Sequence, residues 1–217
     1  MKILVYAPHN DDEVLGAGGT IAKFADEGHE VYVCEVTSGP NPGRVKLIQE
    51  EAKSAHAILG VKDTFFLDLP VVELKNLPAS ELNKKILDIT KLVQPDIAFI
   101  PHKGDMHRDH YEVAMAAMVA LRPIEFPNLK AIYAYETLSE TEWNIQTGDN
   151  LFVPNVWVDI SDYIDKKIQA MECYQSQLQE FPKPRSVKGI KALSEYRGSN
   201  VCKSYAEAFM LIRQLGI

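Results

Sequence analysis

The stretch Lys2–Glu13, KILVYAPHNDDE, decides the fold of this 217-residue chain. Its apolar residues predict a strand that ends at Pro8, and the periodicity that follows predicts a helix from about Glu13 to Glu27. His9 and three carboxylates stand at the junction of the two elements. Because open α/β sheets bind ligands at the carboxyl ends of their strands, we expect a polar site at this turn.

Strands and helices alternate through most of the remaining chain. Further strands are expected at residues 30–37, 64–69, 96–101, 131–136 and 156–160, and further helices at 44–59, 80–93, 111–121 and 161–179. This alternation predicts an α/β fold with a doubly wound, mostly parallel sheet of order 3-2-1-4-5 and helices on both faces. We interpret the C-terminal third, including a Pro/Lys/Gly-rich stretch at 181–198, as an α/β cap or edge of a single domain that spans residues 1–217.

Composition disfavours several classes of protein. The formal net charge of −7 argues against binding to nucleic acid or to anionic lipid. No run of about 18 apolar residues is present, so no membrane-spanning helix is expected. The three cysteines lie far apart in the sequence, at Cys34, Cys173 and Cys202, and form no CxxC pair, so a structural zinc ribbon is not expected. We interpret them as reduced thiols, which favours a cytoplasmic protein.

A second polar cluster, HRDH at residues 107–110, follows the predicted strand 96–101. The first and fourth strands are neighbours in the predicted sheet, so the two clusters are expected to meet at one crevice. Carboxylates packed as densely as Asp11, Asp12 and Glu13 repel one another unless a positive charge lies among them, and a divalent metal is the simplest source. Two histidines and one aspartate, with a position left for water, are typical of a catalytic zinc site.

PHNDDE after the first strand, together with HRDH after the fourth, resembles the LmbE/PIG-L family of zinc-dependent N-acetylglucosaminyl deacetylases, whose fold is Rossmann-like. Segments that match the family more weakly follow in the same order, namely EEAKSAHAILGV, DKKIQAMECYQSQ and SYAEAF. The resemblance implies a metal-dependent hydrolase that removes the N-acetyl group from an N-acetylglucosamine-type sugar or glycoconjugate by means of zinc-activated water. It also makes a homo-oligomer plausible.

The resemblance further implies a role for each residue of the two clusters. The implied metal ligands are His9, Asp12 and His110. Asp11 is the implied general base, a role that a free carboxylate beside the metal can fill. His107 is implied to be protonated and to stabilise the oxyanion, while Asp109 orients it and raises its pKa. The sequence leaves open whether Asp11 or His107 protonates the leaving amine.

The chain departs from the family pattern at three positions. Asn10 replaces a proline of the first motif at a position that is not a ligand, and this change is expected to be tolerated. Ile48 stands where the family often has an arginine, with Arg44 one turn earlier, and Tyr174 stands where a histidine is frequent. Whether Arg44 or Tyr174 contacts substrate is left open by the sequence.

Two alternative functions would use the same crevice. One is a metal-dependent hydrolase of a non-sugar amide or of a phosphoester. A phosphoesterase would need a second metal and a Lys/Arg clamp near the site. The other is a metal-binding or small-molecule-binding module without catalysis, against which the presence of Asp11 argues. The metal is also open, because such a ligand set accepts Fe²⁺, Co²⁺ or Mn²⁺ as well as Zn²⁺.

Some glycines and histidines outside the clusters receive structural interpretations. Gly16, Gly18 and Gly19 lie inside the first helix and lack the third glycine of a dinucleotide fingerprint, so they are expected to allow close packing of helix on sheet rather than to bind NAD. His56 is expected at the surface or in a capping role, whereas His102 is expected to be buried and hydrogen-bonded.

Overall fold

A computed structural model describes residues 1–216, in which seven strands form one sheet in the order β3-β2-β1-β4-β5-β7-β6. The strands are β1 (Lys2–Ala7), β2 (Glu30–Ser38), β3 (Asp63–Pro70), β4 (Ile97–Pro101), β5 (Ala131–Tyr135), β6 (Val156–Asp159) and β7 (Ala206–Gln214). The first five are parallel, while β7 pairs antiparallel with both β5 and β6. The predicted α/β fold and the order of its first five strands are therefore confirmed.

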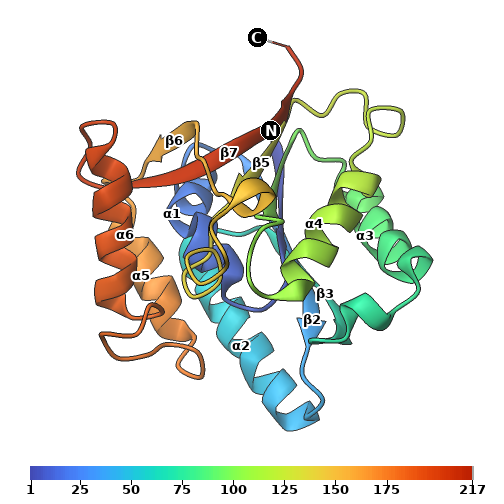
Figure 1. Ribbon diagram of the computed structural model, residues 1–217, viewed down its shortest axis with the longest axis horizontal. Coiled ribbons are helices and arrows are strands. Elements are labelled where there is room, and N and C mark those ends of the chain that lie inside the picture. Colours follow the sequence, from blue (N-terminus) through green and yellow to red (C-terminus); the bar gives the residue numbers. More distant parts are fainter. Residues whose placement is uncertain (217) are drawn as a thin grey trace.

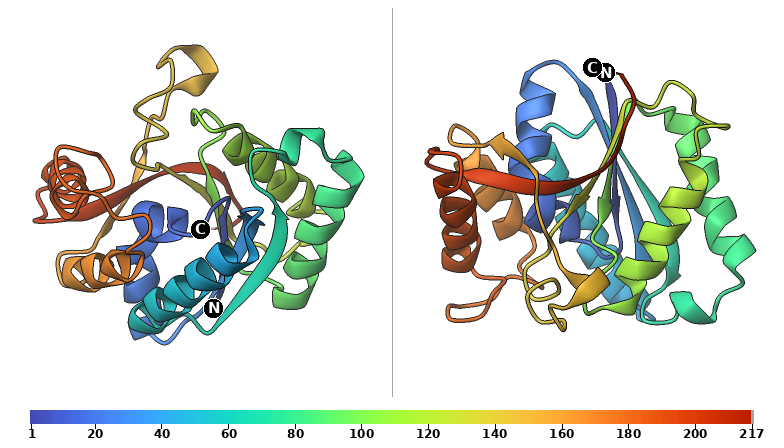
Figure 2. Two further views of the ribbon diagram at one scale, coloured as in Figure 1. Left: turned by 90° about the horizontal axis from the view of Figure 1, so that it is seen from below. Right: turned by 45° about the horizontal axis from the view of Figure 1, so that its top comes forward.

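Helices cover both faces of this sheet. They are α1 (Asp12–Asp26), α2 (Pro42–Leu59), α3 (Ala79–Val93), α4 (Arg108–Ala120), α5 (Ile164–Cys173) and α6 (Val187–Ser199), with short 3-10 turns at Leu74–Asn76 and Gly148–Asn150. Figure 1 shows α3 and α4 on one side and α1, α2, α5 and α6 on the other, and Figure 2 shows the sheet between these two layers. None of the described helices is long and apolar enough to cross a membrane.

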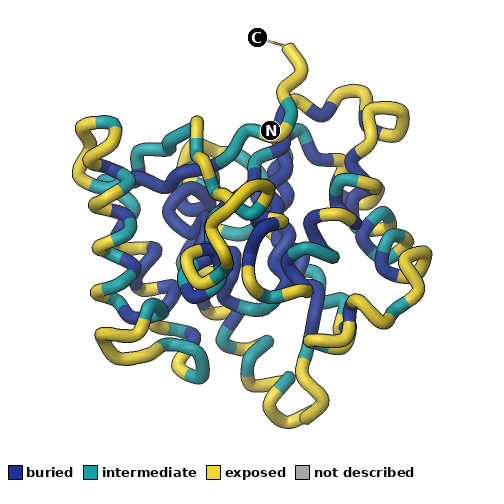
Figure 3. The backbone as a smooth tube through the Cα atoms, in the orientation of Figure 1, coloured by how far each residue is buried: buried dark blue, intermediate teal, exposed yellow. Residues whose placement is uncertain are grey.

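Strand β1 reads as a continuous apolar run because both of its faces are buried. Ile3 and Val5 belong to the core that includes residues of α1, α2 and α5, whereas Leu4 and Tyr6 belong to the core under α3 and α4. The central strands form the dark blue, buried interior of the tube in Figure 3. The alternation of side chains along one strand thus holds the two layers together.

Helix α1 packs closely on its neighbours through its glycines. A Cβ atom on Gly16 would overlap the side chain of Tyr135 in β5, and one on Gly19 would lie 2.7 Å from Cδ1 of Ile160. Only glycine leaves room for these contacts, so the structural interpretation is confirmed for Gly16 and Gly19.

The C-terminal third differs from the prediction in its elements. The helix expected at 161–179 spans only Ile164–Cys173. At its start the hydroxyl of Ser161 donates to Asp159, so Ser161 is not the expected cap. The Pro/Lys/Gly-rich stretch at 181–198, to which no helix was assigned, contains α6, which Ser186 caps by accepting from Gly189 N. Two glycines and several polar residues weaken the helical signal of α6, while burial of Ile190 stabilises it in the folded chain. Strand β7 was also missed, and with β6 it extends the sheet beyond β5 as an edge.

Candidate metal centre and active site

The two polar clusters meet where β1 and β4 end side by side. Helix α1 begins directly after β1, and α4 begins shortly after β4, so both helices start at the same edge of the sheet. Nδ1 of His9 consequently lies 3.3 Å from Nε2 of His110, although about a hundred residues separate them in the sequence. The crevice expected between the first and fourth strands is therefore present.

The geometry of three side chains fits a divalent metal. Oδ2 of Asp12 lies 3.2 Å from Nδ1 of His9 and 3.1 Å from Nε2 of His110. Ligand atoms of a tetrahedral zinc with bonds of about 2.0–2.1 Å stand about 3.3 Å apart, close to these separations. Oδ1 of Asp12 is buried and has no hydrogen-bond partner among the described residues. These two nitrogens and one carboxylate oxygen match the donor set of a zinc or iron site.

A carboxylate outside the two motifs orients His110. Oδ2 of Asp105 lies 2.8 Å from Nδ1 of His110, and Oδ1 of Asp105 accepts a 2.6 Å hydrogen bond from Thr141. Carboxylates that bind the second nitrogen of a metal-ligating histidine fix its ring and tautomer. Asp105 stands between the fourth strand and the HRDH cluster, but its role was not predicted from the sequence.

The electrostatics of the three donor residues favour a positive charge. Burial alone would lower the pKa of His110, but the carboxylates of Asp12 and Asp105 raise it to about 10. Burial opposes ionisation of Asp12, yet the two histidines hold its pKa well below the ordinary value. The site is therefore built to hold a cation between its side chains, whether a proton or a metal ion.

Asp11 presents its side chain to the crevice instead of to its own helix. It occupies the N-cap position of α1 with φ of 117°, and its side chain makes no cap hydrogen bond. Oδ2 accepts a 2.9 Å hydrogen bond from Arg185, whereas Oδ1 is buried without a partner among residues 1–216. Burial raises the pKa of Asp11 to about 7, with Arg185 opposing the shift and Asp12 adding to it.

Arg185 is a site residue that sequence reasoning missed. Its guanidinium also binds Oε1 of Glu140 at 3.2 Å and donates to Oγ of Ser139 at 2.7 Å. Glu140 in turn accepts a 3.1 Å hydrogen bond from the backbone N–H of His107. Arg185 lies in the loop before α6, and no motif marks it, so only folding of the C-terminal third brings it to Asp11.

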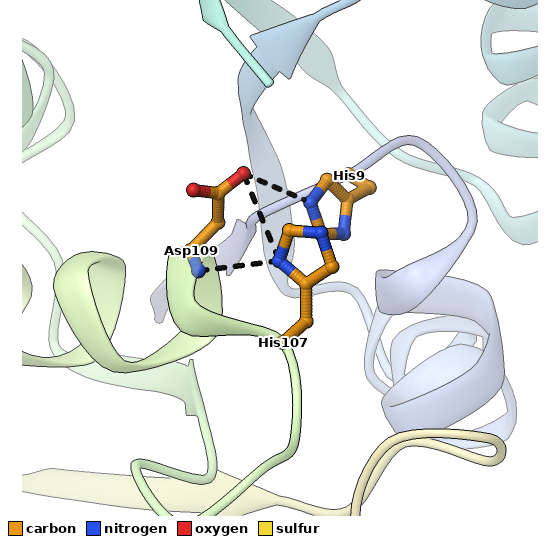
Figure 4. A group of neighbouring side chains, drawn as sticks. All are labelled: His9, His107 and Asp109. Carbon is orange, nitrogen blue, oxygen red and sulfur yellow. Dashed lines mark hydrogen bonds and ion pairs between the residues drawn. The ribbon is translucent and has the colours of Figure 1, made fainter. Parts of the chain in front are cut away.

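Asp109 connects His9 and His107, as Figure 4 shows. Its Oδ2 atom lies 3.3 Å from Nε2 of His9 and 3.8 Å from Nδ1 of His107, and it accepts a 2.7 Å hydrogen bond from the N–H of Val72. The N–H of Asp109 donates to Nδ1 of His107 at 3.2 Å. That nitrogen is an acceptor and carries no proton in this arrangement.

The expected rise in the pKa of His107 is not found. Burial and the nearby ring of His9 together lower its pKa to about 4, while Asp109 acts in the expected direction but is outweighed. The HRDH motif showed that Asp109 lies near His107 and would raise its pKa. The sequence could not show that His107 is partly buried or that the ring of His9 lies beside it. The surroundings of His107 therefore favour the neutral imidazole.

A buried polar cluster supports the start of α1 from behind. Oε1 of Glu13 accepts a 2.7 Å hydrogen bond from Tyr174 and lies 3.1 Å from Nε2 of His56, while Oε2 accepts from the N–H of Asp11 at 3.1 Å. Glu35 lies 3.6 Å from the same His56 nitrogen, and burial together with the charge of Glu13 raises its pKa well above the ordinary value. The surface position expected for His56 is wrong, because the side chain is buried.

The crevice opens into a cavity of about 410 Å³. Its lining residues are His9, Asn10, Asp11, Thr37, Ser38, Gly39, Pro40, Arg44, Ile48, Val71, His107, Glu140, Gln177 and Arg185. Arg44 and Ile48 of α2 thus face the cavity, whereas Tyr174 is fully buried and supports Glu13 instead. His102 is buried as expected, with Nε2 3.1 Å from the carbonyl oxygen of Asn150.

Comparison with known proteins identifies the family. The family described as PIG-L: GlcNAc-PI de-N-acetylase matches residues 4–121, more than half of the chain, which therefore belongs to the PIG-L/LmbE family. The chain is 27% identical to diacetylchitobiose deacetylase of Thermococcus kodakarensis over 97% of its own length and 83% of that protein. A conserved protein of Thermus thermophilus has a similar structure, with a TM-score of 0.79, 28% identity and coverage of 99% of this chain and 96% of that one. The 4-carboxy-2-hydroxymuconate hydratase of Pseudomonas putida shares the fold, with a TM-score of 0.77, 20% identity and coverage of 100% and 98%.

Proposed function

We propose that this protein is a metal-dependent deacetylase, formed by residues 1–217 as one domain, that removes the N-acetyl group from an N-acetylglucosamine-type sugar or glycoconjugate. The observation that carries the proposal is that Asp11 lines the same cavity as His9, one of three residues whose donor atoms lie 3.1–3.3 Å apart. The names of relatives support the deacetylase reaction. Because a hydratase shares the fold, the fold by itself does not define the reaction.

His9, Asp12 and His110 are the proposed ligands of the metal, for which we favour Zn²⁺ over Fe²⁺. When bound, such an ion polarises an amide carbonyl and lowers the pKa of a coordinated water toward about 7. The protein holds the ligands in place through Asp105 on His110 and through Asp109 on His9. Both contacts fix the orientation of an imidazole ring before any ligand arrives.

Asp11 is the proposed general base. Its Oδ1 atom has no partner among the described residues, so it can accept a proton from the attacking water. Its Oδ2 atom is held by Arg185, which fixes the carboxylate and balances its charge in a buried site. Oδ1 is therefore available to accept the proton, while Oδ2 is held by Arg185.

His107 is the proposed donor to the oxyanion, with Asp109 as its positioning residue. Because Nδ1 accepts the N–H of Asp109, the neutral ring carries its proton on Nε2. The side chain lines the cavity together with Asp11, so this N–H can stabilise negative charge on the former carbonyl oxygen. This proposal replaces the protonated imidazole that the family resemblance implied.

The test is release of free primary amine from a panel of N-acetylglucosamine conjugates by zinc-loaded wild type and by Asp11→Ala. We expect turnover by wild type and a loss of at least about a hundredfold in the variant, because general base catalysis contributes about 10²–10⁴-fold. Zinc content measured on both proteins separates loss of the base from loss of the metal. Full turnover by Asp11→Ala with metal bound would refute the base assignment. Silence across the panel, with one zinc per chain, would refute the sugar deacetylase and favour a non-sugar amide or phosphoester.

A further inference from the structure

A second cavity, of about 370 Å³, adjoins the candidate active site on the other side of His107 and Glu140. Its lining residues are Val72, Lys75, Met106, His107, Arg108, Ser139, Glu140 and Trp143. His107 and Glu140 also line the cavity that contains Asp11, so the two cavities are neighbours that share these two side chains. A substrate that extends past His107 and Glu140 would reach this second space.

Three large apolar side chains of this second cavity remain in contact with solvent. Val72 is 56% exposed, Met106 60% and Trp143 58%, although side chains of these types are usually buried. They come from three separate segments of the chain and gather in one concave surface beside the candidate oxyanion donor. Grouped exposed apolar side chains next to convergent polar groups are typical of a ligand site.

The apolar wall is tied to the candidate catalytic residues. Val72 has φ of 70°, a conformation that is strained for a β-branched residue, and its N–H donates to Oδ2 of Asp109 at 2.7 Å. The N–H of Met106 donates to the backbone carbonyl of Glu140 at 3.1 Å. The backbones of Val72 and Met106 are thus held in position before a ligand arrives, which lowers the entropic cost of binding.

We propose that this second cavity binds an apolar aglycone of the substrate, of the class of an aromatic ring, while the acetamido sugar lies in the cavity beside Asp11. The inference rests on the proposed function, since it assigns the remainder of that same substrate. The face of the Trp143 indole is the main contact, because flat aromatic groups stack on it with little loss of side-chain freedom. Met106 and Val72 form the adjacent apolar surface.

The experiment measures binding rather than turnover, so that it does not depend on the reaction. Dissociation constants of the phenyl and methyl glycosides of N-acetylglucosamine are determined by calorimetry on zinc-loaded protein carrying Asp11→Ala. We expect the phenyl glycoside to bind about tenfold more tightly than the methyl glycoside. Adding Trp143→Ala should remove this preference without changing the affinity for the methyl glycoside, and Trp143→Phe should restore most of it.

Ile145→Ala is the matched control, because Ile145 is 72% exposed on the same loop but does not line the cavity. This variant should keep the phenyl preference. Equal affinity of the two glycosides, or a preference that survives Trp143→Ala, would overturn the subsite. Absence of deacetylation by the wild type would instead overturn the proposed function. In that case the difference in affinity between the phenyl and methyl glycosides would still show whether the second cavity binds an aromatic group.

Discussion

Asp11 illustrates at the scale of one residue how the chain makes a carboxylate available for chemistry. An aspartate at a helix N-cap ordinarily accepts a hydrogen bond from the first turn. Here a positive φ turns the side chain away from α1 and toward Arg185, while the backbone carbonyl still accepts from Val14 and Leu15. Strained residues of this kind are concentrated at functional sites. The strain at Asp11 is consistent with the proposed role as base.

The contact between Arg185 and Asp11 leads to a prediction about coupling. We expect Arg185→Ala to lower kcat by about a hundredfold, because a displaced base is costly even at small distances. In a chain that already carries Asp11→Ala, the same substitution should have almost no further effect on the residual rate. Arg185→Lys should recover only part of the activity, since lysine cannot hold two carboxylates in a planar fork.

Steady-state kinetics of the four combinations of Arg185 and Asp11 variants measure this coupling. Equal losses from Arg185→Ala in both backgrounds would show that Arg185 acts independently of Asp11, for example on overall stability. Circular dichroism of each variant verifies that the fold is retained.

At the scale of elements, a buried ion pair joins α5, β7 and α1. Nζ of Lys167 in α5 donates to Oε1 of Glu207 in β7 at 2.6 Å and to the carbonyl of Leu15 in α1 at 2.9 Å. Glu207 also accepts from the backbone N–H groups of Gly19 and Thr20 at 2.9 and 2.7 Å. Leu15 and Gly19 stand one helical turn apart. The ion pair therefore binds a carbonyl oxygen at one end of this turn of α1 and an N–H group at the other end.

Loss of one partner of this pair should be strongly destabilising. We expect Lys167→Met to lower the free energy of unfolding by about 3–5 kcal/mol, because Glu207 is left buried without a counter-charge. Adding Glu207→Gln should recover part of this loss, since the buried charge is then removed as well. Chemical denaturation measures both effects. The control is Lys166→Met at an exposed neighbour, which should change stability by less than about 0.5 kcal/mol, and an equal effect of the two lysine variants would contradict the prediction.

A comparison of the strands with helix α6 shows where sequence patterns fail to predict an element. Strands β1 to β5 were predicted with nearly correct bounds. Strands β1, β2, β4 and β5 are largely buried and lie in strongly apolar runs, whereas the edge strand β3 is mostly half-buried but still carries the apolar residues Phe65, Phe66 and Leu67. Helix α6 carries glycines and lysines, and its residues become helical because they pack against the rest of the chain. Local propensity was therefore a poor guide wherever tertiary contacts provide most of the stability.

At the scale of the whole molecule, the proposed metal connects residues from distant parts of the chain. His9 and Asp12 follow β1, whereas His110 begins α4 on the opposite face of the sheet. An unfolded chain does not hold these ligands together, so metal binding and folding are linked. The donor set is complete only when the parallel sheet has formed between the two helices.

Metal loading should therefore stabilise the folded protein. With free zinc at about 100 times its dissociation constant, we expect a gain of about 2.7 kcal/mol in the free energy of unfolding, reversed by a chelator. His110→Ala should lose most of this gain and the stoichiometric zinc, whereas His29→Ala, far from the site, should retain both. Thermal unfolding followed with and without zinc or ferrous ion measures the gain. Full stabilisation of His110→Ala would exclude this residue as a ligand.

The sequence by itself determined the α/β class, the order of the parallel strands and the approach of the two motifs. These properties follow from local information, because apolar periodicity defines each element and parallel strands bring their carboxyl ends to one edge. Only the tertiary structure decided the contact of Arg185 with Asp11, the orientation of His110 by Asp105 and the lowered pKa of His107. Each of these depends on burial or on partners brought together by packing. No pattern within a short stretch of chain encodes such distances, because they arise from the sum of all contacts in the folded molecule.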